Sequence, residues 1–190
     1  SGDVRVQLVL SLRYGKSKEA RSLIQEIKES RTDNTLLQAL ASASLNAGNE
    51  PDFVKKLKTR IAGKSPYSRE LISKGAVIFR QLCSTCHGAD GKGVKNKEHK
   101  MLAPPLYGSK RVAAADRDVV IRILLHGLSG PVDDKTYPDV MPPMEANDDE
   151  WIASVLSYVR YEFGDDASTV RDDHVKDVRD QTAGRKKYWT

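Results

Sequence analysis

The two cysteines of this 190-residue chain lie three positions apart, and a histidine follows the second directly, in Cys83-Ser-Thr-Cys86-His87. A redox-active pair of the thioredoxin kind needs a strand before it and a helix after it. Here a helical pattern precedes the pair and the glycine-rich stretch HGADGKG follows it. A structural zinc site needs four ligands, and the remaining histidines form no pair at the usual spacing. A disulfide between these cysteines would be strained and would close only a short loop.

The chemistry that remains for this motif is the covalent attachment of haem. Two thiols about one helical turn apart can form thioethers with the two vinyl groups, and the next residue then presents its imidazole to the iron. The motif therefore predicts one haem c, attached through Cys83 and Cys86, with His87 as the proximal iron ligand.

The surroundings of the motif resemble those of class I c-type cytochromes. The stretch GAVIFRQLCSTCHGADGKG resembles the family's first helix and haem loop, which implies that Gly75 and Phe79 pack against the last helix, where we expect Tyr158 to meet them. The stretch APPLYGS resembles the family's Pro-x-Leu turn. This implies that the Pro104 carbonyl accepts the proximal imidazole N–H and that Leu106 packs on the haem.

Two further helices complete the resemblance, which covers roughly residues 68–165. The stretch DRDVVIRILLHGLSG fits the middle helix, starting near Asp116 and ended by Gly127. The closing helix begins near the acidic residues 148–150, which favour a helix N-terminus. Its apolar residues recur at helical spacing: Trp151, Val155, Val159 and Phe163.

The sixth iron ligand is sought in YPDVMPPMEANDDEW, which resembles the family's distal methionine loop. The family's ligand usually stands directly before a proline, and this implies Met141. Met144 is the competitor, and a histidine such as His126 or an open site is the remaining alternative. Met101 lies close to the proximal turn, and we assign it to packing.

The first part of the chain shows short amphipathic helices joined by polar turns, and it resembles HEAT-type helical repeats. The sequence thus predicts an all-α protein: a HEAT-like helical segment at 1–63, a cytochrome c domain at 64–166 and a polar extension at 167–190. Helical-repeat segments followed by a cytochrome c resemble the C-terminal parts of large bacterial dehydrogenase-like proteins. The chain begins within an amphipathic pattern, so we expect it to be a piece of something longer.

Charge and composition limit the classes of partner that we expect for this chain. Residues 67–130 carry 11 Lys and Arg against 5 Asp and Glu, whereas residues 131–190 carry 8 against 14. This division indicates a dipolar surface rather than a uniformly basic one, and aromatic residues are only 6%, so nucleic acid is not an expected partner. No stretch reaches the roughly 18 apolar residues of a membrane span. A run of lysines, at 92, 95, 97 and 100, is either a solvated loop or a docking patch for an acidic redox partner.

The resemblance implies one-electron transfer through a His/Met-ligated haem, not enzyme catalysis by this domain itself. The expected partners are an upstream dehydrogenase domain or a redox protein, and the expected compartment is the bacterial periplasm or another exported location. One alternative is a haem-based ligand sensor or a peroxidase-like site, in which Glu145 and His126 would be the candidates for acid–base work. Another is a protein-binding scaffold in which haem only stabilises the fold.

Overall fold

The computed structural model describes residues 51–190, together with the single positions 22, 25, 26 and 29. The chain separates into two compact units, residues 1–56 and residues 57–190. Most of the HEAT-like segment predicted for residues 1–63 lies outside the described residues. That segment and the domain boundaries drawn with it remain predictions.

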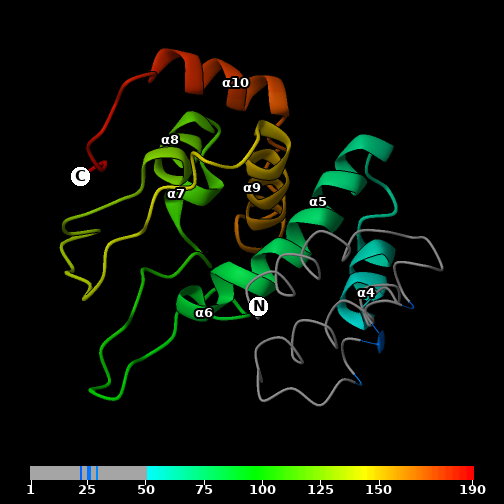
Figure 1. Ribbon diagram of the computed structural model, residues 1–190, viewed down its shortest axis with the longest axis horizontal. Helices are drawn as coiled ribbons and strands as arrows, with labels where there is room; N and C mark the ends of the chain where they lie inside the picture. The colour runs from blue at the N-terminus through cyan, green and yellow to red at the C-terminus, as the bar shows by residue number, and fades with distance from the viewer. Residues whose placement is uncertain (1–21, 23–24, 27–28, 30–50) are drawn as a thin grey trace. The chain divides into compact units, whose positions relative to one another are not determined.

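All regular secondary structure in the described part of the chain is helical, which confirms the predicted all-α class (Figure 1). No helix among the described residues is both long and apolar enough to cross a membrane. In chain order the elements are α4 (Asp52–Arg60), α5 (Pro66–Ile78), the π-helical turn η1 (Phe79–Cys83), α6 (Ser84–His87), α7 (Lys110–Ala113), α8 (Asp118–His126), α9 (Asp149–Phe163) and α10 (Asp172–Gln181).

Helix α5 begins earlier than the sequence suggests. From the sequence alone, Ser68 with Glu70 can start this helix, but Ser65 caps it instead, and the Ser65 hydroxyl accepts a hydrogen bond from the Ser68 backbone N–H at 3.1 Å. Pro66 then occupies the first turn, where the missing N–H of proline costs no helical hydrogen bond. The capping serine therefore lies three residues before the predicted one.

Helices α5 and α9 pack directly on each other and form the centre of the unit (Figure 1). The predicted contact is confirmed, because the Phe79 and Tyr158 ring centroids are 5.4 Å apart and Gly75 leaves no room for a side chain against α9. Phe163 completes the aromatic cluster at 5.1 Å from Phe79. Around it lies a fully buried apolar core that includes Leu71, Ile72, Ala76, Ile121, Leu125 and Ile152.

The ends of α8 and α9 follow the sequence closely. Gly127 ends α8 in a left-handed conformation (φ 75°), which only glycine adopts at little cost. Asp148 caps α9, and its carboxylate accepts a hydrogen bond from the Trp151 backbone N–H at 2.7 Å. These two ends fix where the intervening loop leaves and re-enters the core.

The segment after residue 166 contributes more to the fold than its polar composition indicates. A few valines in a charged sequence predict little apolar surface, yet Val170, Val175 and Val178 are completely buried where α10 packs on α8 and α9. The same charged sequence predicts that His174 faces water, but it is half-buried, with its Nδ1 3.0 Å from Arg117. Within α10 itself, Val175 and Val178 lie about one turn apart and are enough to anchor the helix, because it presents only a narrow apolar stripe to the core.

Candidate functional site

The cysteine motif lies at the end of one continuous helical path. Helix α5 widens into the π turn η1, in which the Ser84 backbone N–H bonds to the Phe79 carbonyl, and the chain then continues as α6. Cys83 is half-buried and Cys86 is exposed, and both thiols are free. The helical geometry therefore holds the two thiols one turn apart, as attachment to a flat ligand at two points requires.

Burial sets the protonation state of the first and last residues of this motif, Cys83 and His87. Removal from water raises the pKa of the Cys83 thiol to about 11, so the thiol is neutral at physiological pH. Reactive redox cysteines show the opposite shift, so this environment argues against a thioredoxin-like pair. Burial also lowers the pKa of His87, which keeps its imidazole in the neutral form that can ligate a metal.

The imidazole of His87 is oriented by the backbone of Pro104. Nδ1 of His87 lies 3.1 Å from the Pro104 carbonyl oxygen. Because a carbonyl only accepts hydrogen bonds, the proton of the neutral ring is on Nδ1 and the lone pair is on Nε2. A ring held in this tautomer is ready to donate Nε2 to a metal ion.

Backbone hydrogen bonds tie the loop after the motif to both ends of the site. The Gly93 N–H donates to the His87 carbonyl at 2.7 Å, and the Leu106 N–H donates to the Gly91 carbonyl at 2.7 Å. Gly91 also has Phe163 against it, since a Cβ there would come within 2.6 Å of that ring. The turn that carries Pro104 and the half-buried Leu106 is thereby fixed to the aromatic core.

The methionine candidates lie on a different segment, which we call the methionine loop (residues 138–148). Met141 exchanges two backbone hydrogen bonds with Leu128, at 2.9 and 3.1 Å, and the Met144 N–H donates to the Leu124 carbonyl at 2.9 Å. Both methionine side chains are half-buried. Met101 instead packs on Gly93, which suits its predicted packing role.

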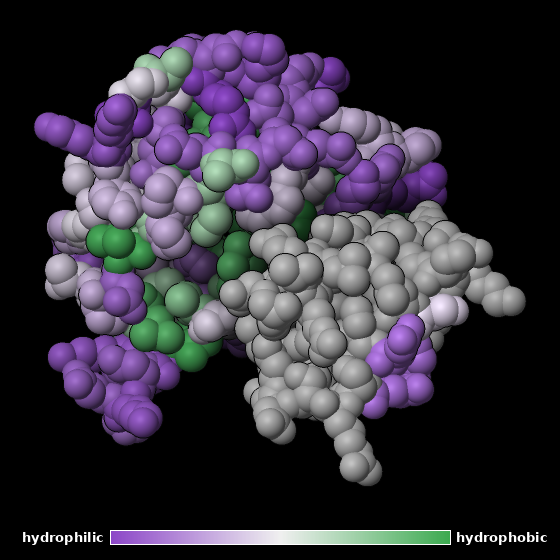
Figure 2. All heavy atoms as spheres, in the orientation of Figure 1, coloured by the Kyte–Doolittle hydropathy of each residue, from purple (hydrophilic) through white to green (hydrophobic). Residues whose placement is uncertain are grey.

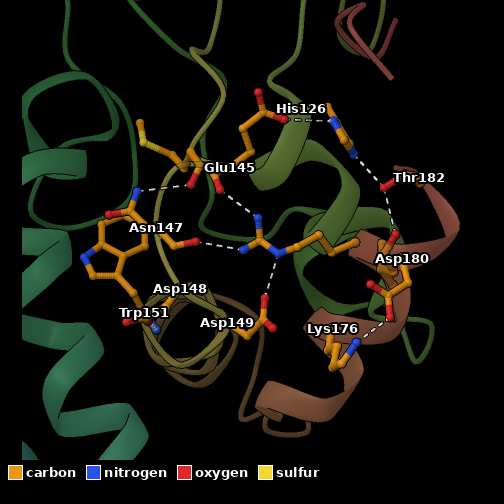
Figure 3. A network of polar contacts seen from close by, with 12 residues as sticks. His126, Glu145, Asn147, Asp148, Asp149, Trp151, Lys176, Asp180 and Thr182 are labelled. Carbon is orange, nitrogen blue, oxygen red and sulfur yellow. Dashed lines mark hydrogen bonds and ion pairs between the residues drawn. The ribbon is translucent and has the colours of Figure 1, made fainter. Parts of the chain in front are cut away.

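The structure places His126 and Glu145, the two acid–base candidates, near each other, and it adds a contact from Thr182. His126 is buried, and its Nε2 lies 2.7 Å from the Thr182 hydroxyl, while its Nδ1 lies 3.8 Å from a Glu145 carboxylate oxygen (Figure 3). Sequence reasoning missed Thr182 and Arg179 in this network. Both lie in or next to a helix whose charged sequence gives no indication of a buried contact.

The surface next to the motif exposes apolar side chains (Figure 2). The described hydrophobic residues that remain strongly exposed include Leu82 at 48%, Tyr107 at 61% and Val140 at 49%, from the motif, the proline turn and the methionine loop. Among the residues described, no group of three or more His, Cys, Asp and Glu side chains is placed to hold a bare metal ion. Free paired thiols, an oriented imidazole and exposed apolar side chains together fit a flat, apolar, iron-bearing macrocycle. The fold and this site have the features expected of a c-type cytochrome domain.

Comparison with known proteins agrees. Residues 72–161 match the family model of cytochrome c and constitute a cytochrome c domain. The chain is 31% identical over 111 residues to the fructose dehydrogenase cytochrome subunit of Gluconobacter japonicus, a match covering 55% of this chain and 22% of that protein. It is 26% identical over 102 residues to the Cbb3-type cytochrome c oxidase subunit FixP of Azorhizobium caulinodans, covering 54% of this chain and 32% of that protein. The domain accordingly carries covalently bound haem c with its iron.

Proposed function

We propose that this domain transfers single electrons through one haem c, attached by Cys83 and Cys86 and ligated by His87 and Met141. The observation that carries the proposal is the hydrogen bond between His87 Nδ1 and the Pro104 carbonyl, directly beside two free thiols. The haem iron, when bound, supplies the reversible one-electron change between the ferric and ferrous states.

The residues of the chain would keep the rearrangement that accompanies electron transfer small. The Pro104 carbonyl fixes the ring of His87, and the bonds from Gly91 and Gly93 fix the loop around it. Leu106 would pack on the haem face. Met141, paired with Leu128 through two backbone hydrogen bonds, would be held in place as the second protein ligand of the iron.

The surroundings of His126 give a peroxidase-like site no support. Such a site needs a distal acid–base group that a bound substrate can reach. His126 is only 8% exposed. The Thr182 hydroxyl donates to the Val178 carbonyl at 2.7 Å, so it accepts from the imidazole. This fixes the imidazole proton on Nε2 and turns Nδ1 toward Glu145, so the imidazole serves the packing of α10 rather than a ligand pocket.

The partners of the domain are inferred from its relatives, of whose lengths the chain matches less than a third. One is named as a cytochrome subunit of a dehydrogenase and the other as a subunit of an oxidase. We propose that this domain likewise accepts electrons from a dehydrogenase domain or partner and passes them to another carrier. We propose an exported compartment such as the bacterial periplasm, because covalent haem attachment implies assembly there.

Optical spectra of the haem-loaded protein, matured in a competent periplasm, test the ligand set. We expect haem to resist acid–acetone extraction, the reduced spectrum to be low-spin, and the sulfur-to-iron band of the oxidised protein to disappear in Met141→Ala. Met144→Ala is the matched control and should keep the band. If only Met144→Ala loses it, Met144 is the ligand. A high-spin wild-type protein would point to an open site and would contradict electron transfer as the main role.

A further inference from the structure

Arg179 on α10 makes two hydrogen bonds to the end of the methionine loop and a third to Asp149, the first residue of α9 (Figure 3). Its guanidinium donates to the Glu145 carbonyl at 2.7 Å and to the Asn147 carbonyl at 2.8 Å, while Nε donates to the Asp149 carboxylate at 2.8 Å. The planar fork of arginine suits such a convergent set of acceptors, and a lysine could not satisfy all three. The end of the methionine loop is therefore tied to a helix that follows it by more than twenty residues.

The last residues of the chain hold the other end of the same loop. The Trp189 N–H donates to the Gly127 carbonyl at 3.1 Å, and the Ser129 N–H donates to the Trp189 carbonyl at 2.9 Å. Leu128 thus lies between Trp189 on one side and Met141 on the other, as the middle of three paired segments. The segment around Leu128, which pairs with Met141, is itself supported by the C-terminal residues.

Gly127 shows how closely these segments pack. A Cβ atom at this position would meet the Met141 carbonyl oxygen at 2.4 Å and the Tyr188 ring at 2.7 Å. The end of α8, the methionine loop and the C-terminal segment therefore converge around Gly127, where there is no room for a side chain.

We propose that residues 172–190, which we call the C-terminal brace, position Met141 as the distal ligand, with Arg179 and Trp189 as the positioning residues. The proposal rests on the proposed function, in which Met141 binds the iron. A ligand loop held at both ends favours the closed state over one in which the methionine has swung away. The brace therefore sets how readily an external ligand replaces the methionine.

Imidazole binding to the ferric, haem-loaded protein measures this closed state, because imidazole must displace the methionine to reach the iron. Arg179→Gln should raise the affinity for imidazole by about tenfold, the factor that the loss of one net hydrogen bond to a charged group produces. Arg179→Lys should fall between this variant and the wild type. Lys176→Gln is the matched control, since Lys176 lies on the same helix, is exposed and, among the residues that the structure describes, forms an ion pair only with Asp180 on α10.

A second variant tests the Trp189 contact without touching Arg179. Trp189→Pro removes the N–H that bonds to Gly127 and should also raise imidazole affinity. Thr190→Pro is its control, because the Thr190 N–H makes no hydrogen bond within the described part of the chain. In both test variants the backbone amides of Leu128 and Met144 should exchange hydrogen faster, while amides in α5 should not.

The outcomes separate the two proposals. If Met141→Ala abolishes the sulfur-to-iron band but Arg179→Gln and Trp189→Pro bind imidazole as the wild type does, the brace has no positioning role. If Met141→Ala leaves the band intact, the ligand assignment fails first and the brace proposal falls with it. Adding Arg179→Gln to Met141→Ala should change imidazole affinity no further. An equal additional effect there would show that the arginine acts on general stability and would overturn the proposal.

Discussion

Gly75 lies so close to Ser154 that a Cβ atom built on the glycine would meet the serine carbonyl oxygen at 1.9 Å. The obstacle is backbone rather than a flexible side chain, so the two helices cannot accommodate an added methyl group by a rotamer change. The crossing of α5 and α9 therefore requires glycine at this position. The aromatic cluster of Phe79, Tyr158 and Phe163 lies at the same contact between α5 and α9, and the cysteine motif follows shortly after Phe79.

Gly75→Ala should destabilise the haem-loaded protein by about 3 kcal/mol or more, because overpacking against fixed backbone forces the helices apart. Urea unfolding followed by circular dichroism measures the loss. Gly63→Ala is the control, since nothing lies within 4 Å of a Cβ at Gly63. Equal unfolding midpoints for the two variants would contradict the close crossing.

Arg160 is a buried cation, only 1% exposed, whose guanidinium donates to the carbonyl oxygens of Val112 and Ser168, each at 2.8 Å. Arg160→Gln should cost about 3 kcal/mol of unfolding free energy, since a shorter side chain leaves buried carbonyls without donors. The midpoint of denaturant unfolding checks this. Arg171→Gln, at an exposed position, is the control and should leave the midpoint unchanged. If Arg160→Gln also left the midpoint unchanged, water would have to satisfy these carbonyls in place of the guanidinium.

His126 should make stability depend on pH. Its pKa is lowered chiefly by burial, with Arg185 and Arg179 adding to the effect and Glu145 opposing it. The unfolded state therefore binds a proton more readily than the folded state. Stability from this group is fully present above the ordinary histidine pKa of 6.5 and is lost as the pH falls below it.

Unfolding midpoints at about pH 7.5 and about pH 5.5 measure this contribution. The decrease on acidification should be smaller in His126→Gln than in the wild type, because glutamine can still donate to Thr182 but does not titrate. His99→Gln is the control at an exposed histidine. A decrease that is the same in all three proteins would assign the pH dependence elsewhere.

Helix α10 should be essential to the stability of the domain despite its charged sequence. Val175→Ala should cost about 2 kcal/mol, from two methyl groups removed from a fully buried site and the cavity that they leave. Lys176→Ala, one residue further on the exposed face, should be neutral. Thermal unfolding of the two variants decides this, and an unaffected Val175→Ala protein would mean that α10 detaches in solution.

The sequence predicts the parts of this fold that rest on local signals. The spacing of Cys83, Cys86 and His87, the glycine that ends α8 and the acidic cap of α9 are all readable because neighbouring residues decide them. The Gly75–Tyr158 contact is also predicted, but through a resemblance rather than through periodicity. These features locate the proximal half of the site.

The remaining features depend on contacts between distant residues. Arg179 reaches a loop that precedes it by more than thirty residues, and nothing in the sequence DDHVKDVRDQ distinguishes it from a solvated arginine. Val175 and Val178 are too few to predict a core face. The π turn at Phe79–Cys83 has no accepted sequence signal, since the same residues read equally well as α-helix.

That π turn gives the motif helix a built-in phase shift. Each residue of an α-helix turns the chain by roughly 100°, so the extra residue in the wide turn resets the angular position of everything after it. Gly75 must face α9, and in the proposed function the cysteines would face the haem. The wide turn allows one unbroken helix to meet both orientations. Removing a single residue between Phe79 and Cys83 would leave the helix intact but would rotate both thiols away from the haem that they are proposed to bind.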